Sequence, residues 1–232
     1  HRLGYLYYHL NNTGKWIAYT EQSLSLARVT QDRFALVTCL YTLGSVYILN
    51  GDYMKGQQYC AEALQFATEA EHPGHIAHAF SLLALCAFCQ GDYTTCQDYA
   101  ERSQAIIEEI NFLVVQAYNL SVLILLACLR EEYAEAVRLA ELAKRHSTNK
   151  MGFQLLYWAL AVVACGVGSP VDVRSYIQNV LQLSDPDIHA GPTMWIVPCM
   201  AYALAATEPE TAVELLAWVF ASTDTALHWA RH

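Results

Sequence analysis

Three histidines spaced three residues apart, His72, His75 and His78, form the group whose type and spacing could hold a metal ion. Imidazoles that share one face of a helix bind zinc or nickel. However, Pro73 and Gly74 predict a loop at this place. A loop would keep His72 off the helix that carries His78, and no carboxylate is placed to support the ring nitrogens. We therefore expect a solvated linker with no metal and no cofactor, and a metal-binding sensor or metal-dependent enzyme is an alternative hypothesis.

Cys86 and Cys89 have the C-x-x-C spacing of zinc knuckles and redox-active thiol pairs, and Cys96 follows after a predicted turn. Structural zinc takes four ligands, usually from two knuckles, and a thioredoxin-like pair needs a βαβ context. The sequence offers one knuckle and no such context, so these thiols are expected to pack inside a helix. All eight cysteines lack the spacing of a disulfide framework, which favours buried thiols in a reducing cytoplasm.

Motifs of common enzyme classes are missing from the sequence. Gly14-Lys15 lacks the upstream Gly and the following Ser or Thr of a phosphate-binding loop, and neither H-E-x-x-H nor G-x-S-x-G occurs. The acidic pairs at 108–109 and 131–132 consist of neighbours that point in different directions, which predicts solvated faces. We expect no catalytic site, because no acid, base and positioning groups converge.

Composition narrows the class of protein. The 232 residues are 55% hydrophobic and 15% charged, with a formal net charge of −9, which favours a helical globular chain. Nucleic acids and anionic membranes attract clustered Lys and Arg, so direct binding to either is not expected. The apolar stretch 112–129 contains Gln116, Asn119 and Ser121, which argues against a membrane span. Without an initiator Met or a signal-peptide pattern, the chain is expected to be a fragment of a longer cytoplasmic protein.

A 40-residue repeat organises the chain. Tyr53, Tyr93 and Tyr133 each follow one apolar helical run and precede another, and the opening segment matches the next unit at the same offset. Each unit predicts two helices joined by a short turn, which must pack antiparallel. At the turn of the second unit Gly51 suits a left-handed helix cap, and Asp52 can accept the first N–H bonds of the next helix.

The fold class that follows is all-α, an α-α superhelix built as a right-handed solenoid of antiparallel helix pairs in one domain over residues 1–232. Repeats are expected at residues 1–31, 32–71, 72–111, 112–148, 149–185 and 186–221. Residues 222–232 are expected to form a capping helix or a frayed tail.

Two local expectations concern backbone and residue size. Gly44, Gly56 and Ala63 are small where the two helices of the second unit should approach most closely. In the last unit, Pro198 should kink or delay a helix expected at residues 192–207.

The second unit carries four landmarks in order: Leu43-Gly44, Tyr47, Gly51-Asp52-Tyr53 and Ala63-Leu64. They stand where the tetratricopeptide repeat has a large–small pair, an aromatic residue, a turn and a small–large pair, so the chain resembles a tetratricopeptide repeat domain. The resemblance covers residues 1–145 well and the remainder weakly. The longer unit, and residues 208–216, resemble the C-terminal sensor arrays of bacterial signal-transduction ATPases with numerous domains, including maltose-regulator-like activators.

This resemblance implies a binding groove. In the family, the first helices of successive pairs line a concave surface, which on this register would present Tyr5, Tyr8, Tyr41, Ser45, His78, Ser81, Phe88, Tyr118 and Ser121. Aromatic rings with polar tips suit a peptide, a partner protein or a small-molecule effector, and packing between helices is the alternative interpretation. The Lys, Arg and Asn that hold a terminal carboxylate in chaperone-binding members are missing.

The sequence therefore predicts a non-catalytic protein- or ligand-binding domain. The resemblance implies the sensor or interaction segment of a larger bacterial signalling or transcription regulator, in contact with other domains of that parent. A static scaffold or self-association module is the alternative.

Overall fold

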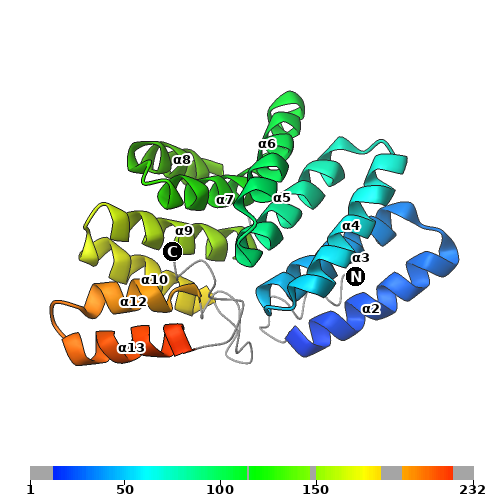
Figure 1. Ribbon diagram of the computed structural model, residues 1–232. Coiled ribbons are helices and arrows are strands. Elements are labelled where there is room, and N and C mark those ends of the chain that lie inside the picture. Colours follow the sequence, from blue (N-terminus) through cyan, green and yellow to red (C-terminus); the bar gives the residue numbers. More distant parts are fainter. Residues whose placement is uncertain (1–12, 114, 147–149, 184–194, 222–232) are drawn as a thin grey trace.

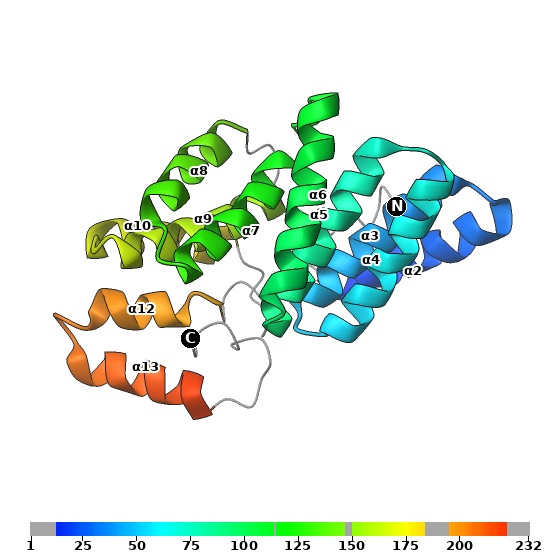
Figure 2. The same ribbon diagram turned by 45° about the horizontal axis from the view of Figure 1, so that its top comes forward.

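The computed structural model describes residues 13–113, 115–146, 150–183 and 195–221. All regular structure in these ranges is helical, and the helices follow one another around an arc (Figures 1 and 2). Successive helices pack in antiparallel pairs, and each pair packs against the next. The predicted all-α solenoid is confirmed. Tyr5, Tyr8 and the tail at 222–232 lie outside the described residues.

Eleven helices occur in the described ranges. Helix α2 (Thr13–Thr30) comes first and five pairs follow: α3 (Arg33–Leu49) with α4 (Tyr53–Glu69), α5 (Pro73–Gln90) with α6 (Tyr93–Ile110), α7 (Gln116–Leu129) with α8 (Tyr133–His146), α9 (Lys150–Gly166) with α10 (Pro170–Leu183), and α12 (Val197–Leu204) with α13 (Pro209–Ala221). The boundaries proposed for the six repeats stay a prediction.

The turns inside the pairs explain the 40-residue period. The three spaced tyrosines are the first residues of α4, α6 and α8. Gly51 takes a left-handed conformation with φ of 82°, and the Asp52 carboxylate accepts the N–H of Lys55 at 3.2 Å. Glu131 takes the same conformation at the third turn, with φ of 59°. Because glycine is absent there, that turn carries backbone strain that the first two avoid.

Small residues let α3 and α4 pack closely, as predicted. A side chain on Gly44 would meet the Cys60 thiol and come within 3.2 Å of the Gly56 carbonyl. A side chain on Gly56 would come within 3.1 Å of the Gly44 carbonyl. Ala63 is fully buried in the same contact. The two glycines are therefore required by backbone approach rather than by a turn.

The two helices of a pair differ in how much of their surface is buried. The first helices form an inner row (α3, α5, α7, α9 and α12), and α3, α5 and α7 bury long runs of consecutive residues. The second helices, together with α2, form an outer row, in which α4 and α6 bury a single stripe. In α6 this stripe is Cys96, Ala100, Ser103 and Ile107, so the rest of the helix faces away from the core.

Pro73 and Pro198 both lie in the first turn of a helix. Pro73 is the first residue of α5 and His72 is its N-cap, so the predicted loop is instead the start of a helix. Proline is accepted there because the first turn has no N–H partner to lose. Pro198 likewise lies in the first turn of α12, where a proline does not kink the helix. In the described part of the chain, no helix combines the length and the apolar character needed to cross a membrane.

Candidate functional site

Most of the residues predicted for the concave groove are covered by neighbouring helices. Five of them are at most 5% exposed: Ser45, Ser81, Phe88, Tyr118 and Ser121. In this conformation they pack inside the array and have almost no surface for a ligand. Tyr41 and His78 are half-buried, and their ring centroids lie 4.2 Å apart. Ligand contact stays a prediction for that pair.

One of the covered residues belongs to a buried polar network between α5, α6 and α7. The hydroxyl of Ser81 lies 2.8 Å from the hydroxyl of Ser103 and 3.3 Å from Oδ1 of Asn119. The Asn119 amide donates to the Ala100 carbonyl at 3.0 Å and to Oε1 of Gln104 at 3.1 Å. Since Ser81, Ser103 and Asn119 are fully buried, these bonds hold α7 in one register against α6.

The three spaced histidines cap and pack α5. Nδ1 of His72 accepts the His75 N–H at 3.3 Å, and the two rings have centroids 4.1 Å apart. Burial, and then a neighbouring imidazole, lower the pKa of His75 to about 4 and that of His78 to about 4, so both rings are neutral at pH 7. Within the described residues, no three His, Cys, Asp or Glu side chains are placed to hold a metal ion.

The C-x-x-C cysteines pack inside α5. The Cys86 thiol donates to the Tyr53 carbonyl at 3.4 Å, and Cys89 is fully buried. Burial raises the pKa of Cys86 to about 12 and also raises the pKa of Cys89. Both thiols are therefore protonated at neutral pH, which disfavours metal or redox chemistry at this pair.

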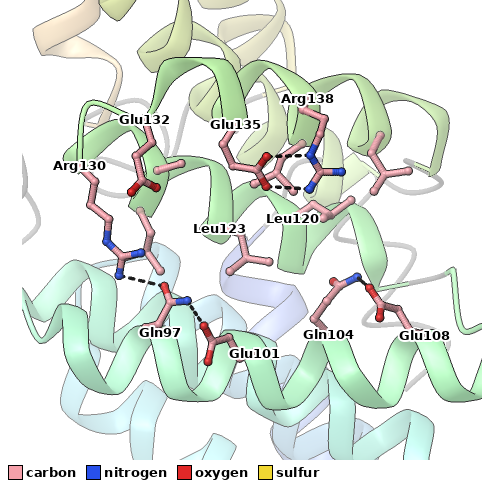
Figure 3. Close-up of a pocket in the computed structure, with 14 residues that line it drawn as sticks. Gln97, Glu101, Gln104, Glu108, Leu120, Leu123, Arg130, Glu132, Glu135 and Arg138 are labelled. Carbon is pink, nitrogen blue, oxygen red and sulfur yellow. Dashed lines mark hydrogen bonds and ion pairs between the residues drawn. The ribbon is translucent and has the colours of Figure 1, made fainter.

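A groove opens on the outer side of α7, between α6 and α8 (Figure 3). Its cavity volume is about 370 Å³. The floor of the groove is aliphatic and comes from α7 and α8: Leu120, Leu123, Leu126, Ala127, Leu139 and Leu142. The two edges are polar and come from α6 and from the start of α8 (Figure 3). An apolar floor between polar edges suits an amphipathic ligand.

The wall formed by α6 is one stripe of that helix. Gln97, Glu101, Gln104 and Glu108 recur at spacings of four, three and four residues, so they share a face. Gln104 donates to Glu108 at 2.8 Å, and Gln97 donates to Glu101 (Figure 3). These bonds orient the carboxylates along the edge. With 1.5 Å per residue, the stripe from 97 to 108 is about 17 Å long.

The groove is acidic. Its charged lining consists of four glutamates and two arginines: Glu101, Glu108, Glu132, Glu135, Arg130 and Arg138. Arg138 donates two bonds of 2.7 Å to Glu135, and this bidentate pairing lowers the pKa of the Glu135 carboxyl. Arg130 reaches across the groove and donates to Gln97 at 3.2 Å. The other three carboxylates form no ion pair with any residue that the structure describes.

Comparison with known proteins identifies the repeat. A family model described as tetratricopeptide repeat matches residues 36–109, and a second model with the same description matches residues 1–30. The chain contains tetratricopeptide repeats. No curated protein matches the chain significantly.

Tetratricopeptide repeats form protein-interaction or scaffold domains and are in general not catalytic. The groove lies where the longer match ends: α6 is inside the matched range except for its last residue, Ile110, whereas α7 and α8 follow it. The wall of the groove thus comes from the matched repeats, and the floor comes from the helix pair that follows them.

Sequence reasoning missed this groove because it placed the site on the inner row and interpreted the outer acidic residues as solvated faces. A signal was present in the sequence. The four-three-four spacing of Gln97, Glu101, Gln104 and Glu108 is helical, and Glu132, Glu135, Leu139 and Leu142 follow a similar spacing 34 or 35 residues later. Only packing shows that these two stripes face each other.

Proposed function

We propose that this chain is a protein-interaction domain whose groove between α6 and α8 binds a basic, amphipathic segment of a partner protein. The observation that carries the proposal is the combination of an aliphatic floor with an acidic rim. Burial of leucine-like side chains would supply most of the affinity, and the rim would select the charge of the partner.

The aliphatic floor has room for inserted side chains. Leu123 and Leu142 are half-buried, so part of each side chain still faces the groove. The deeper Leu120, Leu126 and Leu139 are at most 8% exposed and make the bottom rigid. A partner side chain of leucine size that enters the cavity of about 370 Å³ would therefore contact hydrocarbon on several sides.

The acidic rim favours Lys or Arg on the partner. Glu101, Glu108 and Glu132 are exposed and are not neutralised by a described cation, while Arg138 is already engaged by Glu135. A basic side chain at the edge would find a carboxylate without displacing an existing ion pair. A peptide rich in Asp or Glu would meet repulsion instead.

The length of the α6 wall supports a chain segment over a compact small molecule. A stripe of about 17 Å matches about three turns of a bound helix. Such a helix would place apolar side chains at i, i+3 or i+4, and i+7 toward the floor and basic side chains toward the rim.

The wider setting proposed for this domain is a larger cytoplasmic bacterial signalling or transcription regulator, with the repeats as its sensor or interaction segment. The 40-residue units and the resemblance of residues 208–216 to the last repeat of such regulators support this setting. Binding would act on other domains of the parent only if the partner has unequal affinity for two states of the protein.

A display library of random 12-residue peptides, selected against the purified chain, tests the proposal. Enriched peptides should combine apolar residues at helical spacing with Lys or Arg. Glu108→Lys should weaken the enriched peptide about tenfold, because it reverses a rim charge. Glu109→Lys is the matched control, since Glu109 is exposed on the same helix and does not line the groove. Equal binding by both variants would contradict this site.

Self-association is a second candidate function, and α13 favours it. This outer helix exposes Val213, Leu216 and Trp218, whereas α6 in the same row exposes mainly polar residues. Sedimentation velocity over a range of concentrations would show a dimer that Trp218→Glu dissociates. A monomer at all concentrations would remove this candidate.

A further inference from the structure

A second cavity lies where the inner-row helices α5, α7, α9 and α12 meet the turn between α7 and α8. Its volume is about 370 Å³, and it shares no described lining residue with the groove between α6 and α8. The lining is largely apolar and includes Phe88, Leu125, Leu129, Val162 and Pro198. Because ligand cavities range over about 300–1,000 Å³, this volume suits a small organic molecule better than a peptide segment.

The walls of this cavity are held in place by packing. Phe88 and Leu125 are each 1% exposed, and the Phe88 ring lies edge-on to the Trp158 ring at 5.9 Å. Gly166 is the last residue of α9, and a side chain there would overlap the Tyr133 ring. The missing side chain therefore gives the Tyr133 ring its place in the lining.

One charged group joins this apolar lining. Among the lining residues that the structure describes, Glu131 alone is charged, and it is exposed, so its carboxylate lies at the open side of the cavity. This carboxylate forms no ion pair with any described residue. The neighbouring Arg130 is directed into the groove between α6 and α8, where it donates to Gln97. The cavity therefore presents an uncompensated negative charge beside hydrocarbon.

The backbone at Glu131 makes this carboxylate costly. Three other turns inside the helix pairs place glycine at the left-handed residue, Gly51, Gly91 and Gly168, with φ of 82°, 79° and 77°. Glu131 adopts φ of 59°, a conformation in which a residue with a side chain is strained. Strained residues of this kind are concentrated at ligand sites. The substitution lowers stability and adds a carboxylate to the cavity edge.

We propose that this cavity binds a small hydrophobic amine, whose ammonium group pairs with Glu131 while its hydrocarbon part contacts the apolar walls. Burial of the hydrocarbon supplies the affinity, and the carboxylate selects a cation over an anion. The aromatic rings of Phe88 and Tyr133 favour an arylalkyl group as that hydrocarbon. This inference is independent of the groove between α6 and α8 and does not rest on the function proposed above.

Three probes that share a phenyl ring and a short chain test the charge preference. Phenethylamine is a cation at pH 7, 2-phenylethanol is neutral and phenylacetate is an anion. In ligand-observed NMR titrations of the whole chain, phenethylamine should bind about fivefold more tightly than 2-phenylethanol, and phenylacetate should bind most weakly. Equal affinity for the amine and the alcohol would overturn the role of the carboxylate.

Two glutamate variants locate the site. Glu131→Gln should weaken phenethylamine about fivefold and leave 2-phenylethanol unchanged, because only the ion pair is lost. Glu71→Gln is the matched control: Glu71 is also exposed and left-handed, with φ of 51°, and it lines neither the cavity nor the groove. A similar loss of amine binding in both variants would show a general effect of charge and would overturn this site.

Two further variants separate binding from folding. Glu131→Gly restores the residue of the other turns, so amine binding should weaken while the urea midpoint stays at or above that of the unaltered chain. Val162→Phe projects a larger side chain from a half-buried position into the cavity and should weaken both the amine and the alcohol. A peptide selected for the groove between α6 and α8 should bind all these variants normally. Full phenethylamine affinity in Glu131→Gly or in folded Val162→Phe would overturn the proposal.

Discussion

Two junctions between successive repeats occupy equivalent positions 40 residues apart, yet they differ in how they are filled. At the first junction, where α4, α5 and α6 meet, the Phe80 ring lies 5.8 Å from the Tyr99 ring and 4.2 Å from the Arg102 guanidinium. At the second junction, where α6, α7 and α8 meet, the equivalent residues are Leu120, Leu139 and Leu142. Flat rings and a guanidinium stack across the first junction, and shorter aliphatic side chains leave the groove open at the second.

The buried contacts below the two junctions also differ. Asn119 and Ser103 make the polar network of the second junction, and the equivalent residues at the first are Ala79 and Ala63. All four are fully buried. The energy of apolar packing changes little when one helix shifts slightly along another. Buried donors and acceptors, in contrast, lose their hydrogen-bond partners in such a shift. The second junction, which carries the open groove, is therefore the one held by directional hydrogen bonds.

The hairpins of successive repeats are therefore alike, whereas the junctions between them differ. The turns at residues 51, 91 and 131 have the same left-handed conformation, and α4, α6 and α8 begin 40 residues apart. The groove comes from the residues between hairpins, where shorter side chains leave a surface open without altering the helices.

Removing the amide of Asn119 should have the largest effect on stability. Asn119→Ala removes the buried bonds to the Ser81 hydroxyl and the Ala100 carbonyl and creates a cavity, so the free energy of unfolding should fall by about 3 kcal/mol. Urea unfolding measures this, with Gln104→Ala as control. That variant loses a bond at the edge of the network and should cost less than about 1 kcal/mol. Equal losses would contradict the special role of the buried amide.

Acid should destabilise the packing of α5 on α3, where the rings of His75 and His78 contact Tyr41, more than the packing of α7 on α5, where Val115 and Tyr118 are the equivalent residues. His75 and His78 have folded pKa values of about 4, below the unfolded value of 6.5, so the unfolded chain binds more protons in this interval. Their contribution is complete above pH 6.5 and is lost as the pH falls toward 4. After allowance for screening of these half-buried rings, we expect a loss of about 2 kcal/mol between pH 7 and 5.

The variant His75→Val tests this difference, because valine is the equivalent residue, Val115, in the next repeat. Urea midpoints at pH 7 and pH 5 should lie closer together in the variant than in the unaltered chain. An unchanged difference would show that other groups cause the acid sensitivity.

Truncating the aromatic contact should open the first junction. Phe80→Leu removes the ring that faces Tyr99 and Arg102, and the free energy of unfolding should fall by about 1.5 kcal/mol. Phe34→Leu is the control because that ring is 65% exposed, and its loss should remain below about 0.5 kcal/mol. A neutral Phe80 variant would mean that the stack does not hold this junction.

Transplanting the first junction into the second should close the groove. The triple variant Leu120→Phe, Leu139→Tyr and Leu142→Arg should weaken a groove-selected peptide about tenfold, or about 1.4 kcal/mol. Fluorescence anisotropy measures the affinity, and circular dichroism checks that the helices persist. Full peptide affinity in a folded triple variant would place the binding surface elsewhere.

The helical hairpins could be predicted from sequence because their signals are local. The spaced tyrosines, the glycine turns and the capping aspartates act on neighbouring residues, and the helices begin where these signals stand. The 3.6-residue period separated apolar from polar faces along each helix. The loop expected at Pro73 and Gly74 was wrong because proline marks both loops and first helical turns, and the chain alone does not distinguish the two.

The candidate site was less predictable because it depends on distances between residues far apart in sequence. The period marked Tyr118 and Ser121 as inner residues but did not reveal that other helices cover them. It also did not show that the Gln97–Glu108 stripe faces the leucines of α7 and α8. The spacing between two helices depends on the size of the side chains on both of them. The sequence pattern of one helix therefore does not determine that spacing.

By itself, the sequence determined the helix pairs, their period and their turns, because backbone hydrogen bonding and capping involve residues within one or two helical turns. The tertiary structure decided which polar residues were buried and where a groove opened. Those outcomes depend on how volumes from three helices fill shared space, and a close-packed interior responds to a single ring or methylene group. The inner row therefore became the core, and the outer side of α7 became the surface open to a partner.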